Sequence, residues 1–161
     1  MVYSIFKKLK GEIFIMKCAI YIRTASKNNH DYHLKTQIER LELYIAEQNW
    51  HLYKSYIDIG SGPNMHKNLR SMCEDAQNNE FDVILSTDPS RLFRNPELSS
   101  KMKKLCEMKK IQIVTLDGSI NTQQGNVDLI SLYAWIIEHD TQILSQQIKY
   151  GKKKRLLEQI K

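Results

Sequence analysis

The sequence predicts an α/β fold, with a mostly parallel central sheet flanked by helices and a long C-terminal helix. Two observations support this prediction. Short apolar runs without polar alternation, typical of strands buried on both faces of a sheet, occur at residues 18–22 and 81–86. Segments with apolar residues at helical spacing alternate with the strands, and from Val127 onward the pattern stays helical without a proline.

The predicted elements follow one another without internal repeats. Strands are expected at residues 18–22, 51–58, 81–86 and 111–116. Helical spacing covers residues 34–48 and 69–79. The sequence Asn95-Pro96-Glu97 predicts the start of a further helix, because it supplies an N-cap, a proline at the first helical position and an acid in the first turn.

The length, net charge and cysteine content of the chain limit the classes of function that it can have. The chain has 161 residues, enough for one domain with a proper core, and its net charge of +6 favours an anionic partner. Its three cysteines are widely spaced within apolar patterns, which predicts reduced core thiols in a cytoplasmic protein. No segment has the apolar length needed to cross a membrane. Trp50 and Trp135 are expected to be packing residues.

The chain is expected to hold one domain. Residues 1–15 do not resemble domain material and are predicted to be an N-terminal extension, with Met16 as the alternative start. Lys10-Gly11-Glu12 can be encoded by a purine run similar to a bacterial ribosome-binding site, which favours Met16. Residues 16–161 then form the domain, which ends in the long helix. No separate DNA-binding domain is expected, because no helix-turn-helix or zinc ribbon follows.

Three arginines form the candidate site. Arg23 follows the first strand, and Arg91 and Arg94 follow the third, just before a predicted helix. Because ligands of parallel sheets collect at the carboxyl ends of the strands, these guanidinium groups are expected to converge there. Clustered guanidinium groups bind phosphate through bidentate hydrogen bonds. The alternative is that each arginine pairs separately with an acid on the surface.

Several short motifs together resemble a known family. They are YIRTAS (21–26), Gln37, DIGSG (58–62), FDVIL (81–85), RLFR (91–94), and Ile120-Asn121-Thr122 with Gly125. Their order and spacing resemble the catalytic domains of the serine recombinases, the resolvases, invertases and large serine integrases. The resemblance covers about residues 17–151 and implies a resolvase-like fold.

The resemblance implies site-specific DNA recombination. A serine hydroxyl would attack a backbone phosphate and leave a phosphoserine-linked DNA end, which rejoining reverses. Arg23, Arg91 and Arg94 would stabilise the charge that develops on the phosphoryl oxygens. Gln37 and Ser61 match family positions near the site. No metal or nucleotide cofactor is implied, because the covalent link preserves the phosphodiester energy.

The chain departs from the family pattern at the nucleophile. The family places its serine two residues after the first-strand arginine, where this chain has Ala25. Ser26 can serve if the turn is shifted by one residue, whereas Thr24 faces away from Arg23 if the strand continues. Otherwise the chain lacks a nucleophile, naturally or by a deliberate change, and is a non-catalytic dimerisation or regulatory module.

Other positions depart from the pattern as well. Ser90 replaces the family acid before the first arginine of RLFR, although Asp88 lies close. His66 stands at the basic position after the glycine-serine loop, with Lys67 and Arg70 nearby. In the last helix, Gln146 and Gln147 occupy the expected acidic and basic positions.

The last helix suggests partners. It carries an apolar stripe of Leu132, Ile136, Leu144 and Ile148, followed by the basic residues Lys149, Lys152, Lys153, Lys154 and Arg155. In the family such a helix pairs with that of a second subunit, in a dimer or tetramer, and its basic end contacts DNA. The alternatives are that the stripe is core and that the basic run is a solvated helix end. Recognition of a specific DNA sequence would require a separate targeting subunit or would be absent.

Overall fold

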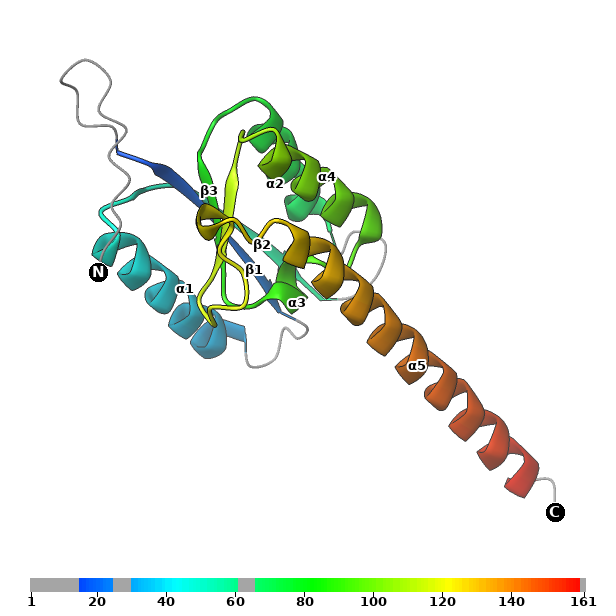
Figure 1. Cartoon of the computed structure of the whole chain (residues 1–161). Coiled ribbons are helices and arrows are strands. Elements are labelled where there is room, and N and C mark those ends of the chain that lie inside the picture. Colours follow the sequence, from blue (N-terminus) through cyan, green and yellow to red (C-terminus); the bar gives the residue numbers. More distant parts are fainter. Residues whose placement is uncertain (1–14, 25–29, 61–65, 160–161) are drawn as a thin grey trace.

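The fold is built on a four-stranded parallel sheet (Figure 1). The computed structural model describes residues 15–24, 30–60 and 66–159. The strands are β1 (Lys17–Thr24), β2 (His51–Ile59), β3 (Val83–Ser86) and β4 (Gln112–Thr115), in the order β2-β1-β3-β4. Each neighbouring pair is parallel. The predicted fold class is therefore confirmed.

Helices cover both faces of the sheet and extend beyond it (Figure 1). They are α1 (His30–Glu47), α2 (Lys67–Gln77), α3 (Pro89–Leu92), α4 (Pro96–Glu107) and α5 (Asp128–Gln159), with a single 3₁₀ turn at Thr122–Gln124. The long C-terminal helix is confirmed. The short helix α3 was not predicted, because a single turn of four residues shows no apolar periodicity.

The side chains of β1 alternate between two hydrophobic clusters. Cys18, Ile20 and Ile22 pack with residues of α1, whereas Ala19 and Tyr21 pack with residues of α2 and α4. This alternation is the two-residue period of a strand, and every one of these five side chains is buried. Arg23 continues the second series, so the strand directs it to the face that carries α2 and α4.

The three cysteines are buried and free, as the sequence predicts for core thiols. Burial raises the pKa of the Cys73 thiol to about 11 and that of Cys106 to about 12, and raises that of Cys18 as well. Because thiolates are the reactive form, these side chains are packing residues in the folded domain.

Three helices are followed by a residue in left-handed backbone geometry. Asn49, Asn79 and Lys109 follow α1, α2 and α4, with φ angles of 55°, 58° and 54°. Asparagine adopts this geometry at lower cost than most residues. The predicted N-cap of α4 is also present, because Asn95 Oδ1 accepts a hydrogen bond of 2.9 Å from the backbone N–H of Leu98.

Part of α5 is less buried than a core helix. Leu132 is 50% exposed, Trp135 57% and Ile136 38%, so the prediction that Trp135 is a packing residue is wrong. The core interpretation of the apolar stripe is also wrong for Leu132 and Ile136. Trp135 instead lies at the surface with its ring against that of His139, at a centroid distance of 4.2 Å. Within the described part of the chain, no helix is long and apolar enough to span a membrane.

Candidate functional site

The carboxyl ends of β1, β2 and β3 lie together at one edge of the sheet, because β1 is central and pairs in parallel with both neighbours. Arg23 and Asp58 are register partners near the ends of β1 and β2. At the end of β3, the Ser86 hydroxyl donates a hydrogen bond of 2.9 Å to the backbone carbonyl of Tyr21. Ligands of open parallel sheets bind at this edge, and the predicted arginine site lies here.

Arg23 is buried, with 7% of its surface exposed. Burial lowers the pKa of its guanidinium, and the positive charges of Arg94 and Arg91 lower it further, against the opposing effects of Tyr21 and Asp58. An arginine remains charged even so. Positive charge is therefore concentrated at the end of β1.

The RLFR sequence places two arginines at the rim of the core. Leu92 and Phe93 are buried at 0% and 1% exposure, which fixes the segment against the hydrophobic cluster. Arg91 and Arg94 flank this pair, half-buried and exposed respectively. Arg91 Nη1 donates a hydrogen bond of 3.3 Å to the backbone carbonyl of Arg23, so the two predicted chain segments meet directly.

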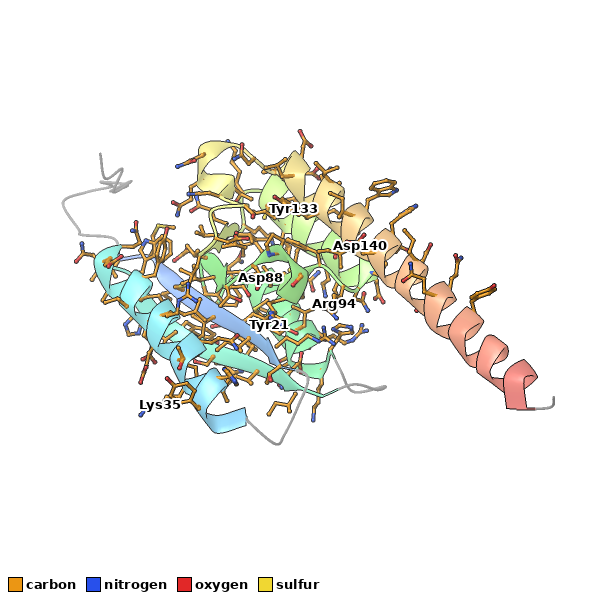
Figure 2. The ribbon with its side chains drawn as sticks, turned by 90° about the horizontal axis from the view of Figure 1, so that it is seen from below. Tyr21, Lys35, Asp88, Arg94, Tyr133 and Asp140 are labelled. Atoms are coloured by element: carbon orange, nitrogen blue, oxygen red, sulfur yellow. The ribbon has the colours of Figure 1, made fainter. Side chains whose placement is uncertain are left out.

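Asp88 holds Arg91 in this position. Its carboxylate lies 3.3 Å from Arg91 Nε and accepts hydrogen bonds from the hydroxyls of Thr87, at 2.9 Å, and Ser90. Burial alone would raise the pKa of this carboxyl, but the bonds from Ser90 and Thr87 and the charge of Arg91 lower it overall. Ser90, directly before this arginine, thus donates to Asp88, and the acid that contacts Arg91 lies three residues upstream of it. Figure 2 shows Asp88 and Arg94 in the region between the sheet and α5.

Asp58 caps α2 from the neighbouring strand. Its buried carboxylate accepts hydrogen bonds of 3.0 Å from the backbone N–H groups of Asn68 and Leu69, in the first turn of α2, and from the hydroxyl of Tyr21. Sequence analysis treated Asp58 only as part of the DIGSG motif and missed this role. The signal was weak, because the capping residue lies ten positions before the N–H group that it caps.

His66 lies at the N-cap position of α2, where its side chain makes no capping hydrogen bond. Burial lowers the pKa of its imidazole, and the charges of Arg23, Arg70 and Arg94 lower it further, while Asp58 opposes them. Arg70 is itself paired with Glu97 at the surface, at 3.5 Å. The structure therefore brings His66 near the arginine cluster.

The remaining predicted site residues are placed less completely. Gln37 lies in α1, and its buried Oε1 has no hydrogen-bond partner among the described residues. Thr24 is half-buried, and its carbonyl accepts a hydrogen bond of 2.8 Å from Gly60 N–H. Ser26 and Ser61 lie outside the described residues, as does Ala25, so the structure does not place the nucleophile.

The predicted DNA-contact residues all lie in α5. Lys149 is exposed, and Gln146 and Gln147 are exposed as well. Lys152, Lys153, Lys154 and Arg155 belong to the last turns of the same helix, within residues 151–159, whose side chains are not described. Beyond Ile137, every described side chain of α5 is exposed to solvent.

Comparisons with known proteins identify a family and similar structures. The family model described as the N-terminal domain of resolvases matches residues 18–159. The chain is similar to the N-terminal catalytic domain of TP901-1 integrase, with 26% identity and a TM-score of 0.59 over 79% of this chain and 98% of that one. It is equally similar in sequence to the C-terminal catalytic domain of ISC1926 TnpA, an IS607-like serine recombinase, with 26% identity and a TM-score of 0.57 over 86% and 99% of the two chains.

A more distant relative shares the fold. A resolvase family site-specific recombinase from Streptococcus pneumoniae has 18% identity and a TM-score of 0.62, over 88% of this chain and 98% of that chain. No curated protein matches the chain significantly. Since the family model spans well over half of the sequence, the chain belongs to the family of resolvase N-terminal domains, the catalytic domains of serine recombinases.

Proposed function

We propose that this chain binds a DNA phosphodiester between Arg23, Arg91 and Arg94 and acts as the catalytic domain of a site-specific recombinase. The observation that carries the proposal is the hydrogen bond from Arg91 Nη1 to the backbone carbonyl of Arg23, which joins the two arginine-bearing chain segments at the sheet edge. The charges of Arg91 and Arg94 also act on the Arg23 guanidinium. Neighbouring cations repel one another, and a phosphate between them would relieve the repulsion. We refer to these three arginines as the phosphate pocket.

Strand cleavage would be a transesterification. The hydroxyl oxygen of Ser26 forms a bond to phosphorus, the bond to one deoxyribose oxygen breaks, and that oxygen leaves as a hydroxyl after taking up a proton. Rejoining is the reverse attack of a DNA hydroxyl on the phosphoserine. The pocket would stabilise charge on the phosphoryl oxygens in both directions, and Gln37 and Ser61 would lie close to it.

A second function is favoured by one specific observation, the alanine at the position where the family pattern has its serine. A methyl group cannot attack phosphorus. In that case the domain would bind DNA or a partner subunit without cleaving, as a dimerisation or regulatory module.

A covalent-capture experiment separates these two functions. The full chain is incubated with a pool of random-sequence duplexes that carry a nick, so that cleavage traps the protein on DNA, and adducts are resolved on a denaturing gel. If Ser26 is the nucleophile, the unchanged chain gives an adduct, Ser26→Ala loses it and Thr24→Ala keeps it. If the domain is non-catalytic, the unchanged chain gives none, whereas Ala25→Ser restores one. Mass spectrometry of the trapped peptide then identifies the phosphorylated serine.

The partners that we propose are DNA and a second copy of the chain. The exposed apolar residues of α5, Leu132, Trp135, Ile136 and Ile143, would pack against the second copy in a dimer or tetramer. Lys149, Lys152, Lys153, Lys154 and Arg155 would contact DNA phosphates.

A further inference from the structure

His66 occupies a helix start without acting as its cap. Asp58 accepts the hydrogen bonds from Asn68 and Leu69 N–H that an N-cap side chain would normally accept. The imidazole is thereby left for another interaction. Its Nδ1 atom is buried and has no hydrogen-bond partner among the residues that the structure describes. A buried polar atom of this kind costs free energy unless something pairs with it.

Charged groups from four segments of the chain act on the imidazole. Arg23 comes from β1, Asp58 from β2, Arg70 from α2, and Arg94 from the segment after α3. Asp58 is already engaged by two backbone N–H groups and the Tyr21 hydroxyl, and Arg70 by Glu97. Two arginines of the phosphate pocket, Arg23 and Arg94, are therefore among the charges that the imidazole meets.

We propose that His66 is a proton-dependent member of the phosphate pocket, which takes up a proton when a phosphodiester binds and so makes binding weaker as the pH rises. The inference rests on the proposed phosphate pocket and deepens it. Arginine stays charged at every physiological pH, so a pocket of arginines alone would bind a phosphodiester with the same affinity throughout that range. A histidine in the pocket makes the affinity depend on pH, because its charge changes within that range.

The direction of the effect follows from the charges. Without an anion, burial and the arginines lower the pKa of His66, so the imidazole is neutral near pH 7. An anion between His66 and the arginines compensates their repulsion and stabilises the imidazolium, which raises its pKa. By linkage, if the anion raises the proton affinity of His66, protonation of His66 raises the affinity for the anion by the same factor.

The first test is an NMR titration of the full chain with sulfate, which stays doubly charged across the pH range used. The imidazole signal of His66 is followed with and without sulfate, and the side-chain Nε signals of Arg23 and Arg91 report on the pocket independently. We expect sulfate to raise the pKa of His66 by about one pH unit. Sulfate should leave the imidazole signal of His51, an exposed residue at the start of β2, unchanged.

The second test compares variants through the sulfate affinity measured at the arginine signals. Between about pH 5.5 and pH 7.5 the affinity of the unchanged chain should fall roughly tenfold. His66→Gln should bind weakly, and His66→Arg tightly, at both pH values. The control His51→Gln should keep the tenfold fall.

The outcomes distinguish this inference from the proposed function. Arginine signals that respond to sulfate while the pKa of His66 stays fixed, or a His66→Gln variant that keeps the pH dependence, would overturn the role of His66 and leave the phosphate pocket standing. If neither the arginine signals nor His66 respond to sulfate, the phosphate pocket is wrong and the inference fails with it.

Discussion

Arg91 is held from two directions, by a carboxylate and by a backbone carbonyl. Asp88 lies 3.3 Å from its Nε atom, and the carbonyl of Arg23 accepts from its Nη1 atom at 3.3 Å. Asp88 therefore neutralises part of the charge of Arg91 at Nε, while the Nη1 atom of the same guanidinium contacts the backbone of Arg23. This arrangement orients a guanidinium group before any ligand arrives, which is the requirement for stabilising charge in a transition state.

We predict that Asp88→Asn loosens Arg91 while the domain stays folded. The amide keeps the size of the side chain but loses the charge that pairs with Nε, and Asp88 is only half-buried. The Nε–H signal of Arg91 should then exchange faster with water, as measured by NMR at neutral pH. Arg70, paired with Glu97, provides the control signal. An unchanged exchange rate at Arg91 would show that Asp88 does not position it.

We also predict that the contact between Asp88 and Arg91 depends on pH. Because the pKa of Asp88 is lowered in the folded domain, its contribution to stability is present at neutral pH and above, and is lost as the pH falls through that lowered value. The Arg91 signal should therefore stay protected through mildly acidic conditions and lose its protection only in strong acid.

Sequence reasoning located the arginines but not all of their neighbours. The arginines were predictable because each follows a strand, and the carboxyl ends of parallel strands meet at one edge of a sheet. The capping role of Asp58 depends on which strand end reaches which helix, and spacing in the sequence does not encode that. Ser26 and Ser61, the predicted nucleophile and loop serine, stay predictions because they lie outside the described residues.

Helix α2 depends on a side chain that belongs to β2. Asp58 accepts hydrogen bonds from two backbone N–H groups in the first turn of α2, which have no acceptor within the helix. Its negative charge also lies at the positive end of the helix dipole. His66 stands at the start of the same helix, where the charges of Arg23 and Arg94 act on its imidazole. We therefore expect a change at Asp58 to reach His66 through the start of α2.

We predict that Asp58→Asn destabilises the domain by about 2 kcal/mol, because a buried carboxylate with three donors is replaced by an amide that can accept from fewer of them. Urea unfolding measures the change. The matched variant Asn95→Ala removes the cap of α4, which accepts one backbone N–H, and should cost about 1 kcal/mol. A smaller loss for Asp58→Asn than for Asn95→Ala would contradict the capping role.

The domain leaves an apolar surface uncovered along α5. Leu132, Trp135, Ile136 and Ile143 are exposed in the single chain, although Ile130, earlier in the same helix, is buried in the core. The alternation of strands and helices made the helix itself predictable. The sequence did not reveal where the helix leaves the core, because its apolar residues are spaced alike on both sides of that point.

We predict that Ile136→Glu converts a dimer into a monomer, because a charge at the centre of an apolar contact cannot be buried without a partner. Sedimentation equilibrium measures the mass. Gln142→Glu, at an exposed polar position of the same helix, adds the same charge and should leave the mass unchanged. A monomeric unchanged chain, or an Ile136→Glu variant that still forms dimers, would show that this surface is not the subunit contact.

The exposed part of α5 has a length that can be compared with one turn of a DNA duplex. From Ile137, after which every described side chain faces solvent, to Gln159, the helix extends about 33 Å at 1.5 Å per residue. One turn of B-form duplex is about as long, at roughly 34 Å. A domain seated on one phosphate by its arginines could thus touch the backbone again a full turn away, and its footprint on DNA would be governed by this arm rather than by the width of the globular part.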